Sequence, residues 1–299
     1  MNDLAPTLLT PAILAALVIS IMGGALSIFV VLKRLAFIGQ GISHTAFGGV
    51  GIALILGIHS TTTAGTVGQL AIVTAFSIAA ALGIAALSRS RNDRATTNTD
   101  TAIGVVLSAS MALGFILFTL AESKHDHDHA GNASHQDGHH LIEEILFGNI
   151  LTTTPTKATI AIALAAIILA YTWCSRRKLI FWAFDDSVVD AFGLNSKALT
   201  NTFLVTLALA IVMAMQIAGV VLAAAMLVLP GAAALNLTAK LKPAFILSII
   251  IATTGAALGL LIGIKADFPA GPAIVLAQSI IYLCTLIIKT IASRSYHPS

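Results

Sequence analysis

Histidine and aspartate are concentrated in one polar segment, residues 122–140, which reads ESKHDHDHAGNASHQDGHH. Imidazoles and carboxylates are ligands for divalent ions such as zinc, nickel and copper, and the intervening Gly, Asn and Ser residues let the backbone wrap around an ion. Because the ligand spacing is irregular, we expect a loop that gathers metal weakly. A solvated low-complexity loop that merely tolerates histidine is the alternative. The candidate ligands are His125, His127, His129, His135, His139 and His140.

A second group of possible metal ligands, Gln40, Ser43 and His44, lies where an apolar run begins. Gln40 and His44 are four residues apart, so in a helix their side chains share one face and could converge on a single ion. An ionisable side chain at membrane depth is a functional hypothesis by default. The alternative is a histidine near a helix end that has its hydrogen bonds satisfied at the membrane interface.

The elements that position these residues are predicted by composition. Of the 299 residues, 57% are hydrophobic and only 10% are charged. A soluble domain carries about 25% charged residues, so this chain is an integral membrane protein. The net charge of +3 is too small, and the Lys and Arg residues are too scattered, to suggest nucleic acid as a partner.

The two cysteines, Cys174 and Cys284, are too few and too far apart in the sequence to form a disulfide framework.

Apolar runs of roughly 20 residues predict an all-α transmembrane bundle of about nine spans in a single domain, residues 1–299. With the N-terminus outside and the C-terminus inside, most Lys and Arg residues fall in cytoplasmic segments, as the positive-inside rule requires. The segment 122–140 is then an extracytoplasmic loop. The predicted spans are residues 12–32, 43–58, 69–87, 101–121, 157–174, 199–217, 218–237, 244–264 and 271–288.

Small and polar residues within the spans indicate how the helices pack. Gly255, Gly259 and Gly263 form a GxxxGxxxG face, which favours close approach of a neighbouring helix. Asn201, Gln216 and Gln278 are polar positions in the spans and are expected to hydrogen bond between helices. Pro230 is expected to kink or break the seventh span, because proline frees a backbone carbonyl.

The longest predicted cytoplasmic loop is 176–198, which contains the aromatic run FWAF at 181–184. Aromatic residues followed by a short amphipathic turn suit an element that lies along the membrane surface, either on lipid or in the groove of a partner. The sequence has no GxxxxGK[ST] motif for nucleotide hydrolysis and no HExxH motif for a zinc protease. The chain is therefore not expected to be an enzyme, and any pumping must draw on another subunit or on an ion gradient.

Six short blocks occur in order along residues 12–288: GISHTA at 41–46, DTAIGV at 100–105, LFGNIL at 146–151, FD at 184–185 with Ala191 and Gly193, LVLPGAA at 227–233, and FPAGP at 268–272. In this order and spacing they resemble the permease subunits of bacterial ATP-binding-cassette importers for zinc, manganese or iron. The resemblance implies a multi-pass protein of the bacterial cytoplasmic (inner) membrane.

The resemblance also implies partners: a second permease in a homodimeric or pseudo-dimeric pore, cytoplasmic ATPase subunits, and an extracytoplasmic metal-binding protein that delivers the ion. It implies that Phe184, Asp185, Ala191 and Gly193 belong to the element that couples to the ATPase. Members of the family commonly carry Asp four residues before the histidine of the Ser-His block, where this chain has Gln40. A neutral amide binds Mn(II) or Zn(II) more weakly than a carboxylate does.

The leading hypothesis is a permease subunit of an ATP-driven divalent metal importer, with zinc as the expected cargo and no permanently bound cofactor. The alternative is a self-sufficient secondary carrier or channel. That alternative needs acidic relays inside the spans, which contain essentially no Asp or Glu. An intramembrane enzyme, a third possibility, has no supporting constellation of nucleophile, base or metal ligands.

Overall fold

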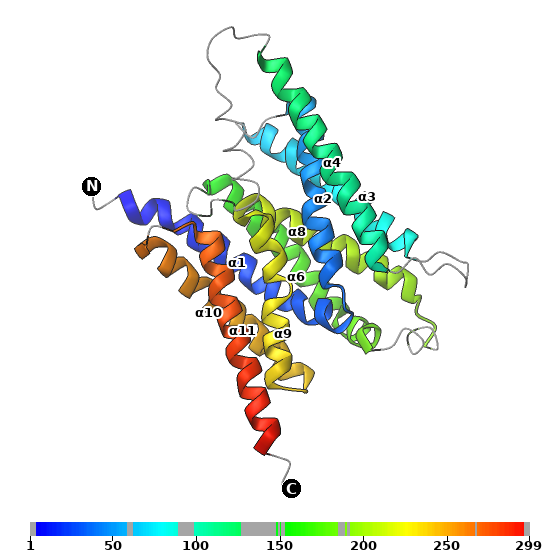
Figure 1. The fold of residues 1–299 in the computed structure, drawn as a ribbon, viewed down its shortest axis with the longest axis vertical. Coiled ribbons are helices and arrows are strands. Elements are labelled where there is room, and N and C mark those ends of the chain that lie inside the picture. Colours follow the sequence, from blue (N-terminus) through cyan, green and yellow to red (C-terminus); the bar gives the residue numbers. More distant parts are fainter. Residues whose placement is uncertain are drawn as a thin grey trace.

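The computed structural model describes residues 4–58, 62–88, 99–126, 148, 150, 153–184, 189, 192–266 and 268–295. This part of the chain folds into helices, which confirms the predicted all-α class (Figure 1). Eight stretches are long and apolar enough to cross a membrane. The helices are α1 (Leu4–Leu32), α2 (Ala36–Ile55), α3 (Thr63–Leu87), α4 (Thr99–Asp126), α6 (Pro155–Phe184), α8 (Ser196–Met226), α9 (Leu229–Leu237), α10 (Leu241–Ala266) and α11 (Ala270–Ser295).

The longest of these stretches, Ser196–Leu237, reverses direction at Gly219. Its 42 residues would extend far beyond a hydrocarbon core of about 30 Å if they were straight. Gly219 has φ 81° and ψ 164°, which glycine adopts readily. Before the break, the ring of Phe203 lies 6.0 Å from that of Phe29 on α1. After it, Met226 lies against Gly23, and Gly231 lies against Ser27.

These contacts fix the direction of each half of the stretch. If the helix were straight from Phe203, which lies at the level of Phe29, Met226 would lie near the other end of α1, yet it returns to the level of Gly23. The chain therefore runs out along residues 196–218 and back along residues 220–237. Counting both halves, the described helices cross the membrane region in nine passes, in line with the predicted bundle of about nine spans.

The nine passes place the two termini at opposite ends of the bundle, as Figure 1 shows. One end, which we call the basic end, is crowded with positive charge; the opposite end carries Lys157 and Lys265. Such clustering is what the positive-inside rule requires of a cytoplasmic face. The assignment of the basic end to the cytoplasm remains a prediction. The basic end holds Lys33, Arg34, Arg176, Arg177, Lys178, Lys197, Lys240, Lys242 and Lys289.

Helices α2, α3 and α4 form one closely packed group, the α2–α4 unit, in which α2 packs far more extensively on α4 and α3 than on α1 (Figure 1). Glycines permit this approach. A Cβ atom on Gly49 would lie 2.8 Å from the Cα of Val73 on α3, and one on Gly51 would lie 3.0 Å from the carbonyl oxygen of Gly114 on α4. The crowding explains why α2 is rich in glycine.

A second group, the α1–α11 unit, consists of α1, α9, α10 and α11. The hydroxyls of Ser27 on α1 and Ser248 on α10 lie 2.9 Å apart, and Ser248 also donates to the carbonyl oxygen of Gly24 at 2.8 Å. Gly259 faces the backbone of Ile274 on α11. The predicted glycine face of α10 is thus confirmed as a packing surface.

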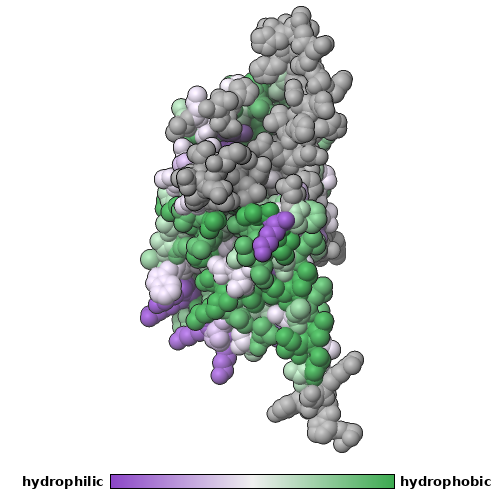
Figure 2. All heavy atoms as spheres, turned by 90° about the vertical axis from the view of Figure 1, so that its left-hand side faces the viewer, coloured by the Kyte–Doolittle hydropathy of each residue, from purple (hydrophilic) through white to green (hydrophobic). Residues whose placement is uncertain are grey.

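The outer face of this second unit is apolar. Large hydrophobic side chains such as Ile246, Leu261, Leu276 and Ile280 are exposed on α10 and α11. Figure 2 shows a broad hydrophobic surface on this side of the molecule, with hydrophilic residues gathered toward one end. Such a band suits contact with lipid tails.

Candidate transit site and partner surface

The predicted ligands Gln40, Ser43 and His44 all lie on α2, within the helix rather than at its start. Gln40 is exposed, His44 is half-buried, and Ser43 is fully buried. The Ser43 hydroxyl donates to the carbonyl oxygen of Gln40 at 2.8 Å, so it serves the helix backbone. The structure therefore brings Gln40 and His44 onto one accessible side of α2. Ser43 is directed into the protein.

The α1–α2 turn sets where α2 begins. The amide of Leu35 donates to the carbonyl oxygen of Val30 at 2.8 Å, and that of Arg34 to the carbonyl oxygen of Val31 at 3.1 Å. This pattern is a Schellman motif, which ends α1 with Arg34 in the left-handed region at φ 56°. Because the turn is so short, α2 starts at Ala36, several residues before the predicted span at 43–58.

Gln40 and His44 offer a metal ion only uncharged ligand atoms, an amide oxygen and an imidazole nitrogen. Within the described ranges of the chain, no group of three or more His, Cys, Asp or Glu side chains is arranged to hold a metal ion. A divalent transition metal is usually held by four or more ligands. Gln40 and His44 of a single chain are therefore an incomplete set of ligands.

The predicted histidine-rich loop falls almost entirely outside the described residues. His125 lies in the last turn of α4, and His127, His129, His135, His139 and His140 lie beyond it. Helices α2 and α4 run in parallel, because Gly41 lies against Ile103 and Gly51 against Gly114. Helix α4 therefore ends at the end of the bundle opposite the basic end, which is where the segment 122–140 begins.

The prediction of a loop over 176–198 is wrong for residues 176–184, because α6 continues to Phe184. The apolar run 157–174 ends in a basic cluster, but the long side chains of such a cluster can extend from a helix into the membrane interface. Phe184 is 65% exposed. Gly193 lies in a turn with φ 72°, while Asp185 and Ala191 lie outside the described residues.

An aromatic surface patch, Phe181, Phe184 and Phe192, marks the basic end. Phe181 and Phe192 are 52% and 74% exposed, and their ring centroids lie 6.0 Å apart. Exposed aromatic side chains that gather in this way commonly mark a binding surface. Phe192 lies between Ala191 and Gly193, inside the element from Phe184 to Gly193 that the sequence predicts to couple to the ATPase.

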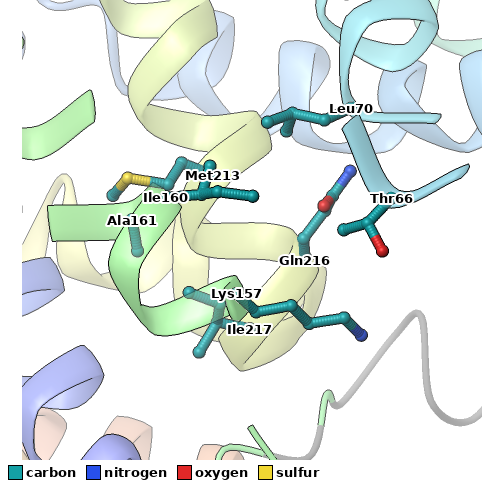
Figure 3. A pocket seen from close by; sticks show the side chains of 8 residues that line it. All are labelled: Thr66, Leu70, Lys157, Ile160, Ala161, Met213, Gln216 and Ile217. Atoms are coloured by element: carbon teal, nitrogen blue, oxygen red, sulfur yellow. The ribbon is translucent and has the colours of Figure 1, made fainter. Parts of the chain in front are cut away.

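A small pocket at the opposite end is lined mainly by apolar side chains (Figure 3). Thr66 of α3, Gln216 of α8 and Lys157 of α6 supply its polar groups. The positive charge of Lys157 disfavours a divalent cation there, so this pocket does not extend the candidate transit site. The lining residues are Thr66, Leu70, Lys157, Ile160, Ala161, Met213, Gln216 and Ile217.

The fold and these sites define a polytopic helical membrane protein with a polar pair on α2 and an aromatic patch at its basic end. The chain belongs to the ABC 3 transport family, whose model matches residues 6–289. It is thus a multi-pass protein of the bacterial cytoplasmic membrane, as the sequence predicted.

Named relatives match nearly the whole chain. The "Manganese transport system membrane protein MntC" of Listeria monocytogenes is 31% identical over 274 residues, covering 92% of this chain and 88% of the relative. A "Probable iron transport system membrane protein" of Haemophilus influenzae is 30% identical, with 95% and 94% covered. The solved structure "PsaBC from Streptococcus pneumoniae in complex with Fab" superimposes with a TM-score of 0.75 at 30% identity, covering 93% of this chain and 90% of that one.

Proposed function

We propose that this chain is the permease subunit of an ATP-driven importer of divalent metal ions. The observation that carries the proposal is the family match over residues 6–289, supported by relatives named for manganese and iron transport. The sequence has no P-loop, so ATP would be hydrolysed by a cytoplasmic partner subunit. An extracytoplasmic metal-binding protein would deliver the ion to the end opposite the basic end.

Zinc is the cargo that we propose, on the basis of the histidine-rich segment 122–140. Imidazole nitrogen is a favoured zinc ligand, whereas manganese prefers carboxylate and carbonyl oxygen. Gln40, which stands where related permeases commonly carry Asp, does not distinguish the two metals, because an amide binds Mn(II) and Zn(II) alike more weakly than a carboxylate does. Manganese is the second candidate, because relatives covering most of this chain are named for manganese transport.

The transit site is proposed to form between two copies of this chain. One copy contributes the imidazole of His44 and the amide of Gln40, and a second copy would add another such pair. Four neutral donors would complete a tetrahedral set for zinc. They would also hold it weakly, because no carboxylate neutralises the ion, and weak binding favours release.

The ATPase subunit is proposed to dock on the aromatic patch of Phe181, Phe184 and Phe192. Its exposed rings would provide the apolar anchor that a partner groove requires. Lys178 and Lys197, on either side of the patch, would add charge that steers an acidic partner surface. The alternative is that these exposed rings contact the lipid surface and bind no partner.

Uptake into proteoliposomes tests this function. The permease would be reconstituted with its ATPase and binding protein, and radioactive zinc, manganese and iron would be compared as substrates. We expect ATP-dependent uptake with zinc preferred. His44→Ala should lower uptake at least about tenfold, because it removes a metal ligand. The matched control is Thr119→Ala, which removes an exposed hydroxyl bonded within α4.

Each result separates the alternatives. Zinc accumulation by the permease alone, without the ATPase, would contradict the importer proposal and favour a secondary carrier. A preference for manganese would retain the importer and overturn the choice of zinc. Full activity of His44→Ala would remove the transit site from α2.

A further inference from the structure

Trp182 is a buried residue of α6, the helix that carries Phe181 and Phe184 of the aromatic patch. It lies two residues before Phe184 on α6 and is 1% exposed. Its indole Nε1 donates a hydrogen bond to the Thr200 hydroxyl at 2.9 Å, and its ring centroid lies 5.0 Å from that of Phe203. Because Thr200 and Phe203 are on α8, Trp182 joins the helices on both sides of the loop that carries Phe192.

The same indole ring contacts the α1–α2 turn. The ammonium of Lys33 lies 4.7 Å from the centroid of the Trp182 ring, within the range of a cation–π interaction. Lys33 directly precedes Arg34, the residue in the left-handed region, and α2 begins at Ala36. His44 follows on α2 after about two helical turns.

The contact between Lys33 and Trp182 can influence α2 because α2 makes few other contacts with α1. Helix α2 packs mainly on α3 and α4 and only slightly on α1, so the short α1–α2 turn is their principal connection. The ring of Phe203 continues the contact to Phe29, whose centroid lies 6.0 Å away on α1. Phe29 and Lys33, at the end of α1 that leads into the turn, therefore both contact one aromatic cluster.

We propose that Lys33 and Trp182 are positioning residues that couple movement at the aromatic patch to the orientation of α2 and hence of His44. When α6 shifts, the indole ring carries Lys33 with it, and the turn at Arg34 transmits the shift to α2. This inference rests on the proposed function, because it assumes that an ATPase docks at the patch. A packing role for the aromatic cluster alone would require no charge on Lys33.

The experiment measures metal ions transported per ATP hydrolysed by the complete transporter in proteoliposomes. Lys33→Gln removes the cation while keeping much of the stem. We expect its transport ratio to fall about fivefold or more, a typical strength of coupling between sites, with ATPase binding and thermal stability unchanged. Lys33→Arg should restore the ratio, because a guanidinium also stacks on indole. Lys242→Gln, at an exposed lysine of α10 at the same end of the bundle, is the matched control.

A double variant sharpens the assignment. If Lys33 acts through the indole ring, Lys33→Gln combined with Trp182→Leu should be no worse than Trp182→Leu alone. Additive losses would overturn the proposal. So would an unchanged ratio in Lys33→Gln, an equal fall in Lys242→Gln, or a failure of Lys33→Arg to restore coupling.

Phe184→Ala distinguishes the two proposals. It should reduce co-purification of the ATPase, whereas Lys33→Gln should not. If Phe184→Ala binds the ATPase normally while Lys33→Gln uncouples transport, the docking surface is wrong, and Lys33 positions α2 through Trp182 without the ATPase acting at the patch. If Phe184→Ala releases the ATPase and Lys33→Gln transports normally, docking stands and the positioning role is wrong.

Discussion

The α2–α4 unit and the α1–α11 unit achieve close helix packing by different chemistry. In the α2–α4 unit, Gly49 and Gly51 allow backbone to touch backbone. In the α1–α11 unit, the buried hydroxyls of Ser27 and Ser248 add hydrogen bonds between α1 and α10. Steric packing holds helices together without a directional tie, whereas a hydrogen bond fixes one relative position.

This difference between packing by glycine and linking by hydrogen bonds affects which helices can move during transport. The polar pair of Gln40 and His44 lies in the α2–α4 unit, while α1 is tied to α10 through Ser248 and Gly24. Motion of α2 relative to α1 must therefore pass through the short turn at Arg34 or through α8, which packs on both α2 and α3. Three substitutions probe this contrast, from the largest expected effect to the smallest.

Gly49→Ala is expected to have the largest effect. The added methyl would lie 2.8 Å from the Cα of Val73, so α2 and α3 must move apart. Overpacking of this kind costs about 1–3 kcal/mol. Equilibrium unfolding in mixed micelles measures the loss. Gly83→Ala on α3 is the control, because its methyl meets nothing within 4 Å. Equal stability of the two variants would show that glycine packing does not hold the α2–α4 unit.

Ser248→Ala is expected to have an intermediate effect. It deletes the bonds to Ser27 and to the Gly24 carbonyl oxygen, but Ser27 keeps its own bond to that carbonyl at 3.1 Å. Hydrogen bonds between membrane helices contribute about 0.6 kcal/mol on average, and the same unfolding assay should show a loss of that order.

Thr254→Val is the matched control for Ser248→Ala. The exposed Thr254 hydroxyl donates to the carbonyl oxygen of Ile250 in its own helix at 2.7 Å. Its removal should therefore leave stability nearly unchanged. If Thr254→Val lowers the free energy of unfolding as much as Ser248→Ala does, the hydrogen bonds between α1 and α10 add no more stability than a bond within one helix.

Gln278→Met is expected to have the smallest effect. Gln278 is fully buried on α11, and its Nε2 donates to the Met226 sulfur at 2.9 Å. Its Oε1 has no hydrogen-bond partner among the residues that the structure describes. Replacement by an apolar side chain of similar length should change the free energy of unfolding by less than about 0.5 kcal/mol. A loss above about 1.5 kcal/mol would show that the amide is fully satisfied.

Particular residues show how far sequence reasoning reached. The pairing of Gln40 with His44 followed from a spacing of four, because a helix repeats every 3.6 residues. The role of Gln278 between helices was also predicted, and its bond to Met226 confirms it. The break that Pro230 predicts in the seventh span is confirmed, because α8 ends at Met226 and a new helix, α9, begins at Leu229 with Pro230 in its first turn. The larger reversal occurs at Gly219, close to the predicted boundary between the sixth and seventh spans.

Other features gave no usable signal in the sequence. Ser43 stands beside His44, but whether its hydroxyl faces an ion or its own backbone depends on which side of α2 the neighbouring helices cover. Trp182 is one of several aromatics in a short run, and only its burial separates it from the exposed Phe181 and Phe184. The end of α6 was misplaced because charge marks the membrane interface and does not end a helix.

The amino-acid sequence by itself determined that this chain crosses the membrane repeatedly, because apolar length and charge placement are local properties that a bilayer selects directly. It also located the six histidines of the segment 122–140 and the pair of Gln40 and His44 in the chain. Only the tertiary structure decided that Lys33 meets Trp182, and that α2 belongs with α3 and α4 rather than with α1. Such contacts join residues far apart in the chain, and they depend on how helix surfaces fit together, which no local pattern encodes.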